Sequence, residues 1–193
     1  MRKLFALFFL LPLSSAYGGG DESVQVNQCD YNRKIGNNVK TRERVFEINE
    51  NQYLYVKQST AIKKDLDKAD LNISASCQSL TGTHYTGTTE EWNGYFGKVL
   101  KGLEQKGFVE ADVTLHTGNN SVYTGYLTSR EITVSAQRQD KSLLYRALAV
   151  LDLENNTLYT LSVSGEPSLK EKLEEEFKAQ FNNMSIHTQE QKL

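Results

Sequence analysis

The sequence is poor in residues that carry metal or nucleophilic chemistry. Its 193 residues include two cysteines and three histidines, and neither cysteine has further metal ligands at short spacing. No segment matches a nucleophile elbow, a phosphate-binding loop or a zinc-protease helix. We therefore expect no metal site, no cofactor and no catalytic residue, which favours a protein that is not an enzyme.

An excess of positive charge is also absent. The chain has 22 Lys and Arg against 24 Asp and Glu, a formal net charge of −2 at pH 7. A mildly acidic chain without a basic cluster argues against binding to nucleic acid or to an anionic membrane surface. With 193 residues, of which 38% are hydrophobic, the chain is typical of one globular domain with a core of its own.

The one long apolar run stands at the N-terminus. Arg2 and Lys3 precede residues 4–13, which are nearly all apolar, and the small residues of Ser-Ser-Ala follow. This order predicts a secretory signal peptide over residues 1–16, cleaved after Ala16. The run is too short for a membrane span, which takes about 20 residues, and no lipid-anchor cysteine follows it. We expect an exported, secreted chain in the periplasm or outside the cell, without a transmembrane segment once mature.

Export makes a disulfide the first interpretation of the two cysteines, Cys29 and Cys77. A metal site and a reactive thiol are the alternatives. The disulfide closes a loop of about 49 residues and stabilises the fold by about 4 kcal/mol in the chain-entropy description. Residues 17–43 are polar and contain glycine and asparagine clusters, so we expect a loosely ordered N-terminal leader that Cys29 ties to the domain.

The first half of the domain predicts strands around one amphipathic helix. Residues 44–48 and 52–57 are expected to form a hairpin. A helix is then expected over 60–69 and a strand over 71–76. Thr88 and Glu91 then have the spacing of a capping box, and Gly107 is placed to end a second helix. The apolar face of that helix is formed by Trp92, Tyr95, Phe96, Val99, Leu100 and Leu103.

Strands dominate the second half. Apolar and polar residues alternate between turn residues, which predicts strands over 109–116, 122–128, 131–138, 143–153 and 159–163. Residues 143–153 are apolar on both faces, as in a strand covered on two sides. Ser168 and Glu171 mark a closing helix with apolar positions Leu169, Leu173, Phe177, Phe181 and Met184. The fold class is α+β: one domain over residues 44–187, an antiparallel β-sheet meander with flanking helices, before a frayed tail at 188–193.

The C-terminal unit has a further feature. Strand, short polar turn, strand (LYTLSVSG, Leu158–Gly165) and closing helix (ending in FNNMSI, Phe181–Ile186) follow one another. This order resembles the PsbP-like superfamily, including the DcrB-like bacterial envelope proteins, and the resemblance covers about residues 44–186. It implies an α/β/α-type sandwich with an antiparallel sheet, usually an accessory or binding partner without catalysis. The chain lacks the lipid-anchor cysteine of DcrB-like proteins, and no functional residue is carried over.

The best candidate site is the segment 79–89, which is rich in threonine and glycine. Within it, Thr83, His84, Tyr85 and Thr86 form a candidate binding loop. We predict an exported, non-catalytic protein that binds another protein of the cell envelope, of accessory, inhibitor or immunity type. Tyrosines make good protein-binding anchors where they are exposed, and seven lie on predicted strands and loops: Tyr53, Tyr55, Tyr85, Tyr123, Tyr126, Tyr145 and Tyr159.

Two alternatives remain open. The first is a hydrolase in which His84 acts with nearby carboxylates, those of Glu90 and Glu91, because a general base needs an oriented partner. The second is a carrier for a small apolar ligand, held in a pocket between a helix and the sheet.

Overall fold

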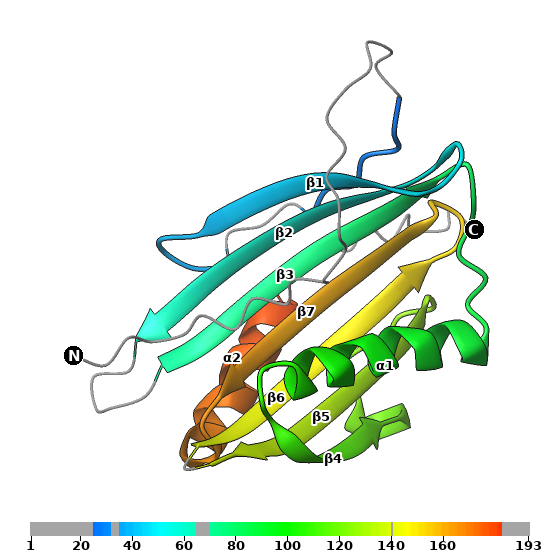
Figure 1. The fold of residues 1–193 in the computed structure, drawn as a ribbon. Helices are drawn as coiled ribbons and strands as arrows, with labels where there is room; N and C mark the ends of the chain where they lie inside the picture. Colours follow the sequence, from blue (N-terminus) through cyan, green and yellow to red (C-terminus); the bar gives the residue numbers. More distant parts are fainter. Residues whose placement is uncertain (1–24, 32–34, 65–69, 140, 183–193) are drawn as a thin grey trace.

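The computed structural model describes residues 25–31, 35–64, 70–139 and 141–182. These residues form one seven-stranded sheet, two α-helices and two short 3-10 turns (Figure 1). In chain order the elements are β1 (Lys40–Asn49), β2 (Gln52–Lys64), β3 (Asp70–Thr81), α1 (Thr89–Glu104), β4 (Val109–His116), η1 (Gly118–Asn120), β5 (Thr128–Arg138), β6 (Lys141–Asp152), β7 (Thr157–Gly165), η2 (Pro167–Leu169) and α2 (Lys170–Asn182). The predicted signal peptide (1–16) and tail (188–193) lie outside the described residues.

The sheet is antiparallel throughout, in the order β1-β2-β3-β7-β6-β5-β4. The predicted α+β class with an antiparallel sheet is therefore confirmed. The strands do not form a single meander, because β3 pairs with β7 and α1 carries the chain from β3 to β4 at the far edge (Figure 1). This order places β6 and β7, the most buried strands, at the centre of the sheet.

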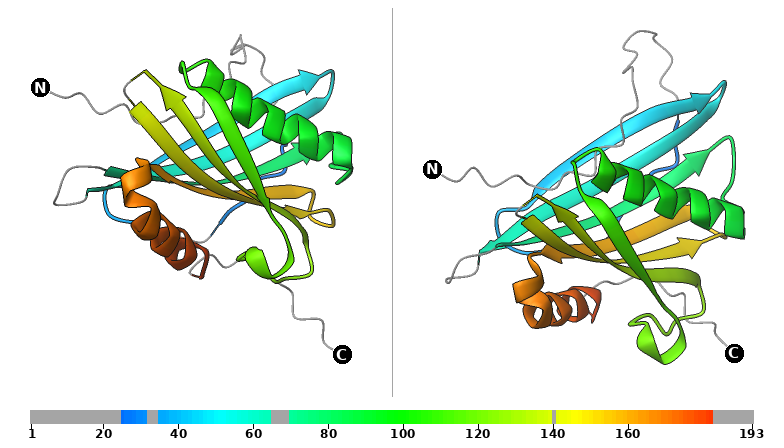
Figure 2. Two further views of the ribbon diagram at one scale, coloured as in Figure 1. Left: turned by 90° about the horizontal axis from the view of Figure 1, so that it is seen from below. Right: turned by 60° about the horizontal axis from the view of Figure 1, so that its bottom comes forward.

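The two helices lie on opposite faces of the sheet (Figure 2). Alternate side chains of strand β6 point toward one helix and then the other, and every residue from Leu143 to Asp152 is buried. On one face Leu143, Tyr145 and Ala147 pack in the cluster that contains Val99 and Leu103 of α1. On the other face, Leu144, Leu148 and Val150 pack in the cluster that contains Leu173 and Phe177 of α2. The prediction of a strand covered on two sides is confirmed.

A disulfide joins Cys29 to Cys77 of β3, with the two Cα atoms 6.0 Å apart. The predicted bond is therefore present. It holds part of the N-terminal segment against the α2 side of the sheet, where Tyr31 and Ile35 are buried in the same cluster as Phe177. Residues on this segment thus contribute to the main core.

Three predicted boundaries were wrong. Residues 60–64 continue β2 and pair with 70–74 of β3, so the helix expected there is replaced by a longer strand; the rest of that prediction, 65–69, lies outside the described residues. No strand forms over 122–127, because the backbone N–H of Val122 donates to the Glu131 side chain and that of Tyr123 to the Ser121 side chain. Ser168 lies within η2 and caps no helix, since α2 begins at Lys170.

Candidate functional site

A polar cleft of about 740 Å³ opens between α2 and the sheet on the side of β4. Two residues of β4, a loop before β5, one residue of β6 and the last turn of α2 line it. These are Thr114, His116, Asn119, Asn120, Ser121, Val122, Arg146, Lys178, Phe181 and Asn182. The cleft brings together segments that are up to 68 residues apart in the sequence, from Thr114 to Asn182.

Strand register explains why these side chains meet. Thr114 is the Cα partner of Thr133, and Thr133 is the Cα partner of Arg146. Partners across an antiparallel ladder point to the same face, and for these residues that is the face of α2, because alternate neighbours such as Val134 and Tyr145 pack toward α1. His116, opposite Glu131 and two residues along β4 from Thr114, points to the same side.

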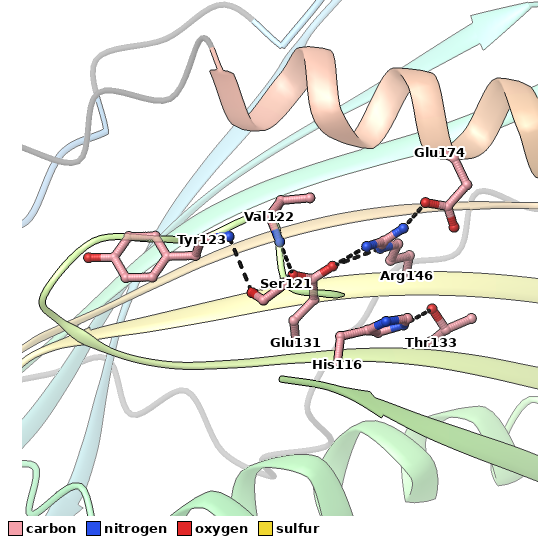
Figure 3. Close-up of polar contacts among 8 residues, drawn as sticks. All are labelled: His116, Ser121, Val122, Tyr123, Glu131, Thr133, Arg146 and Glu174. Carbon is pink, nitrogen blue, oxygen red and sulfur yellow. Dashed lines mark hydrogen bonds and ion pairs between the residues drawn. The ribbon is translucent and has the colours of Figure 1, made fainter. Parts of the chain in front are cut away.

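The guanidinium of Arg146 is the centre of the site (Figure 3). Its Nε donates a hydrogen bond of 2.8 Å to Oε1 of Glu131, and its Nη2 donates to the same oxygen. Its Nη1 forms an ion pair with Glu174 of α2. The guanidinium carbon lies 4.9 Å from the centre of the Phe177 ring, in a cation–π contact. The Arg146 side chain, 7% exposed, is thus held in one position by two carboxylates and a ring.

Glu131 also fixes the loop that borders the cleft. Its second oxygen, Oε2, accepts hydrogen bonds of 2.8 Å from the Ser121 hydroxyl and from the backbone N–H of Val122. The next residue, Tyr123, meets the Phe181 ring of α2 edge-on, with ring centres 6.2 Å apart. A single buried carboxylate therefore connects β5, β6 and this loop, and the loop is in turn packed on α2.

His116 lies at the wall of the cleft formed by β4. Its Nε2 shares a hydrogen bond of 2.7 Å with the Thr133 hydroxyl. Burial and the nearby charge of Arg146 lower the pKa of His116 from 6.5, while the carboxylate of Glu131 acts in the opposite direction. The His116 ring is therefore neutral at pH 7.

The candidate loop of the sequence lies elsewhere, between β3 and α1. The ring of Tyr85 packs on the cluster around Trp92, and the backbone N–H of Tyr85 donates to the side-chain oxygen of Asn156. Thr86 and Gly87 donate their N–H groups to the carboxylate of Glu91 at 2.9 and 2.7 Å. These contacts hold the segment, which also includes Thr83, against the body of the protein.

His84, the residue predicted to act as a general base, is exposed. Within the described part of the chain its ring has no hydrogen-bond or ion-pair partner, and the carboxylate of Glu91 is used by the loop backbone and the Thr86 hydroxyl. The structure thus does not bring Glu91 to His84 as an orienting partner. The hydrolase alternative stays a prediction.

The predicted tyrosine surface is not formed. Tyr126 is 67% exposed, whereas the other six tyrosines are buried or half-buried. Sequence reasoning also missed Glu131 and Arg146, the two residues that organise the cleft. A signal for Arg146 was present: it is the one basic residue inside the apolar run 143–153, and a buried charge requires a partner.

Neither a membrane-spanning helix nor a group of three metal-ligating side chains occurs among the described residues. No protein-family model and no curated protein sequence matches the chain. Among solved structures, a protein of unknown function from Pseudomonas aeruginosa is similar, with 10% sequence identity and a TM-score of 0.43 over 72% of this chain and 93% of that chain. A likeness of this extent assigns neither a family nor a function, and the PsbP-like resemblance stays a prediction.

Proposed function

We propose that this is an exported, non-catalytic protein of the periplasm that binds another protein of the cell envelope. The N-terminal pattern of residues 1–16 and the Cys29–Cys77 disulfide support export. The arrangement of α1 and α2 on opposite faces is in keeping with a PsbP-like α/β/α sandwich, which we include in the proposal. The observation that carries the binding function is the edge strand β4.

Strand β4 ends the sheet and exposes apolar side chains beside α1. Val113 and Leu115 are 42% and 54% exposed. Their Cα partners on β5 are Val134 and Ile132, both buried under α1. The apolar surface of the α1 face therefore continues beyond the helix onto the edge of the sheet, where a second strand would cover it.

The opposite edge of the sheet is different. Strand β1 also exposes apolar side chains, Val45 and Ile48, but it carries charged side chains along its length, at Lys40, Arg42, Glu43, Arg44 and Glu47. Charged side chains on an edge strand oppose pairing with another chain. Strand β4 carries Glu110 and Asp112 in its first half, where its register with β5 shifts, whereas its last four residues, Val113–His116, carry no acidic or basic side chain other than His116. Of the two edges in the described sheet, the part of β4 at Val113–His116 is thus the segment best suited to accept a strand.

We infer that the partner adds a strand to β4. Its backbone would bond to the outer edge of β4, and its alternate side chains would cover Val113 and Leu115. Backbone pairing provides affinity in this mode, and the apolar contacts provide the register. An accessory, an inhibitor and an immunity role are each compatible with such a complex, and the identity of the partner assigns the role.

The test is capture of partners from the native envelope fraction by the mature, disulfide-bonded chain. Leu115→Glu should abolish capture of a stoichiometric partner, because it places a charge in the apolar contact. Val45→Glu, an equally exposed position on β1 (51% exposed), is the matched control and should retain the partner. Hydrogen exchange of the purified complex should show protection across residues 109–116. Capture that Leu115→Glu leaves unchanged would contradict the proposal, provided both variants keep the wild-type unfolding midpoint.

A further inference from the structure

We propose that the cleft beside Arg146 binds a small organic anion, recognised by its carboxylate or phosphate group. This site lies on the α2 face of the sheet, opposite the apolar surface of Val113 and Leu115, although Thr114 and His116 of β4 also line it, so its test uses a variant on α2. The argument depends on which hydrogen-bonding groups of the cleft are already used within the protein.

Both carboxylates next to the cleft are used internally. Oε1 of Glu131 accepts from Arg146, and its Oε2 accepts from Ser121 and Val122. Glu174 is paired with Nη1 of Arg146. Because these acceptors face Arg146 and the loop, the charged groups left for a ligand, on Arg146 and Lys178, are donors.

Arg146 retains donors of its own. Each terminal nitrogen of a guanidinium carries a pair of hydrogens, and the contacts of Nη1 and Nη2 use one hydrogen each. The remaining two belong to a side chain that lines the cleft and is fixed by Glu131, Glu174 and the Phe177 ring. A fixed, largely desolvated guanidinium is well suited to a planar carboxylate or to a phosphate.

Lys178 and His116 flank Arg146 within the cleft. Lys178 is exposed on α2 and forms no ion pair with another described residue. The Nε2 of His116 is occupied by Thr133, which leaves Nδ1 as a second hydrogen-bonding atom of the ring. An ammonium, a guanidinium and an imidazole from three different elements therefore border one space.

The charges of this site predict how binding depends on pH. With His116 neutral, Arg146 and Lys178 are balanced by Glu131 and Glu174, so recognition depends on directed hydrogen bonds. Protonation of His116 leaves a net positive site, and a bound anion favours that protonation. We therefore expect tighter binding as the pH is lowered from about 7.5 to about 6.

The size and lining of the cleft indicate the rest of the ligand. A volume of about 740 Å³ exceeds what a lone phosphate or acetate fills. The amides of Asn119 and Asn120 offer donors and acceptors together, and Phe181 adds an apolar wall. This lining suits a hydroxylated anion of the size of a sugar phosphate or sugar acid.

The experiment is a titration of the full mature chain followed by amide chemical shifts. The probes are glucose 6-phosphate, glucuronate, inorganic phosphate and uncharged glucose, each at about pH 6 and about pH 7.5. Lys178→Ala removes one charged donor and should weaken binding about tenfold. Lys170→Ala, which removes an exposed lysine of α2 that does not line the cleft, is the matched control and should leave the affinity unchanged.

Shifts at residues 114–122 with a charged sugar, stronger at the lower pH and reduced in Lys178→Ala, are the expected result. Response to glucose 6-phosphate but not to glucuronate assigns a phosphate ligand, and the reverse assigns a carboxylate. The proposal is overturned if neither charged sugar shifts these residues, if glucose binds equally well, or if Lys170→Ala weakens binding as much as Lys178→Ala. Each of these results leaves the β4 interaction unaffected, so the two proposals fail separately.

Discussion

The carboxylate of Glu131 on β5 and the guanidinium of Arg146 on β6 form a buried ion pair, with Nε to Oε1 at 2.8 Å. Their side chains are 0% and 7% exposed. A buried ion pair often stabilises a fold no more than apolar side chains of the same size would, because both charges lose their hydration. Its effect here is positional: Glu131 holds the loop at Ser121 and Val122, and Arg146 faces the cleft.

Replacing Glu131 by alanine should lower the free energy of unfolding by about 3 kcal/mol, because Arg146 loses its buried counter-charge and the loop loses two hydrogen bonds. Denaturant unfolding measures the change. Glu174→Ala is the comparison, since Glu174 is 26% exposed and water can replace its contact with Arg146. We expect a loss of about 1 kcal/mol for that variant. Equal losses for the two variants would show that Glu131 has no special structural role.

The pH dependence of stability should carry a contribution from His116. Its pKa in the folded state is lowered by burial and by Arg146, so just below pH 6.5 the unfolded chain binds a proton that the folded chain does not. Stability must therefore fall as the pH drops below 6.5, and this loss ends once the folded protein is protonated too. Proton NMR of the His116 ring measures its pKa directly.

His116→Gln serves as the control, because it keeps a hydrogen-bonding side chain opposite Thr133 but cannot gain a proton. The variant should show a smaller loss of stability between about pH 7 and about pH 5.5 than the wild type. An unchanged loss would assign the acid sensitivity to other groups.

Much of the fold could be predicted because local patterns agree with it. Residues 143–153 are apolar on both faces, and β6 is indeed covered by a helix on each side. Thr88 and Glu91 predicted the start of α1, and the Thr88 hydroxyl accepts the N–H of Glu91 at 3.3 Å. Periodicity and capping act within a few residues, so the sequence displays them directly.

The pairing of β7 with β3 and the cleft could not be predicted in the same way. Strand order depends on long-range contacts, and alternation alone does not state which strand is the neighbour. Glu131 appeared as one of the polar partners of Ile132 and Val134, as in a strand with a solvated face. It is buried because Arg146, the Ser121 hydroxyl and a backbone N–H satisfy its oxygens, and these partners become visible only after folding.

Tyr145 should ionise late in an alkaline titration. Burial under α1 raises its pKa to about 12, and a hydrogen bond with Ser162 reduces the shift. In the unfolded chain Tyr145 ionises near its ordinary pKa of about 10. The contribution of this difference to stability is therefore complete below that pH and is lost as the pH rises toward about 12. Phenolate absorbance measures the titration, and Tyr145→Phe should remove one tyrosine from its late part, to which Tyr85 and Tyr95 also contribute because burial raises their pKa values. If Tyr145→Phe left the amplitude of the late part unchanged, the buried position of Tyr145 would be contradicted.

The Cys29–Cys77 bond should stabilise the domain by about 4 kcal/mol in the chain-entropy description, because it restricts the unfolded chain over a sequence separation of 48. The loss on reduction should also reach the core, since Tyr31 and Ile35 pack with Phe177 and depend on this segment for their position. Denaturant unfolding with and without reductant measures the difference. The double variant Cys29→Ser, Cys77→Ser should match the reduced wild type and show no response to reductant. If reduction left the unfolding midpoint unchanged, the noncovalent contacts of the N-terminal segment would be sufficient to hold it.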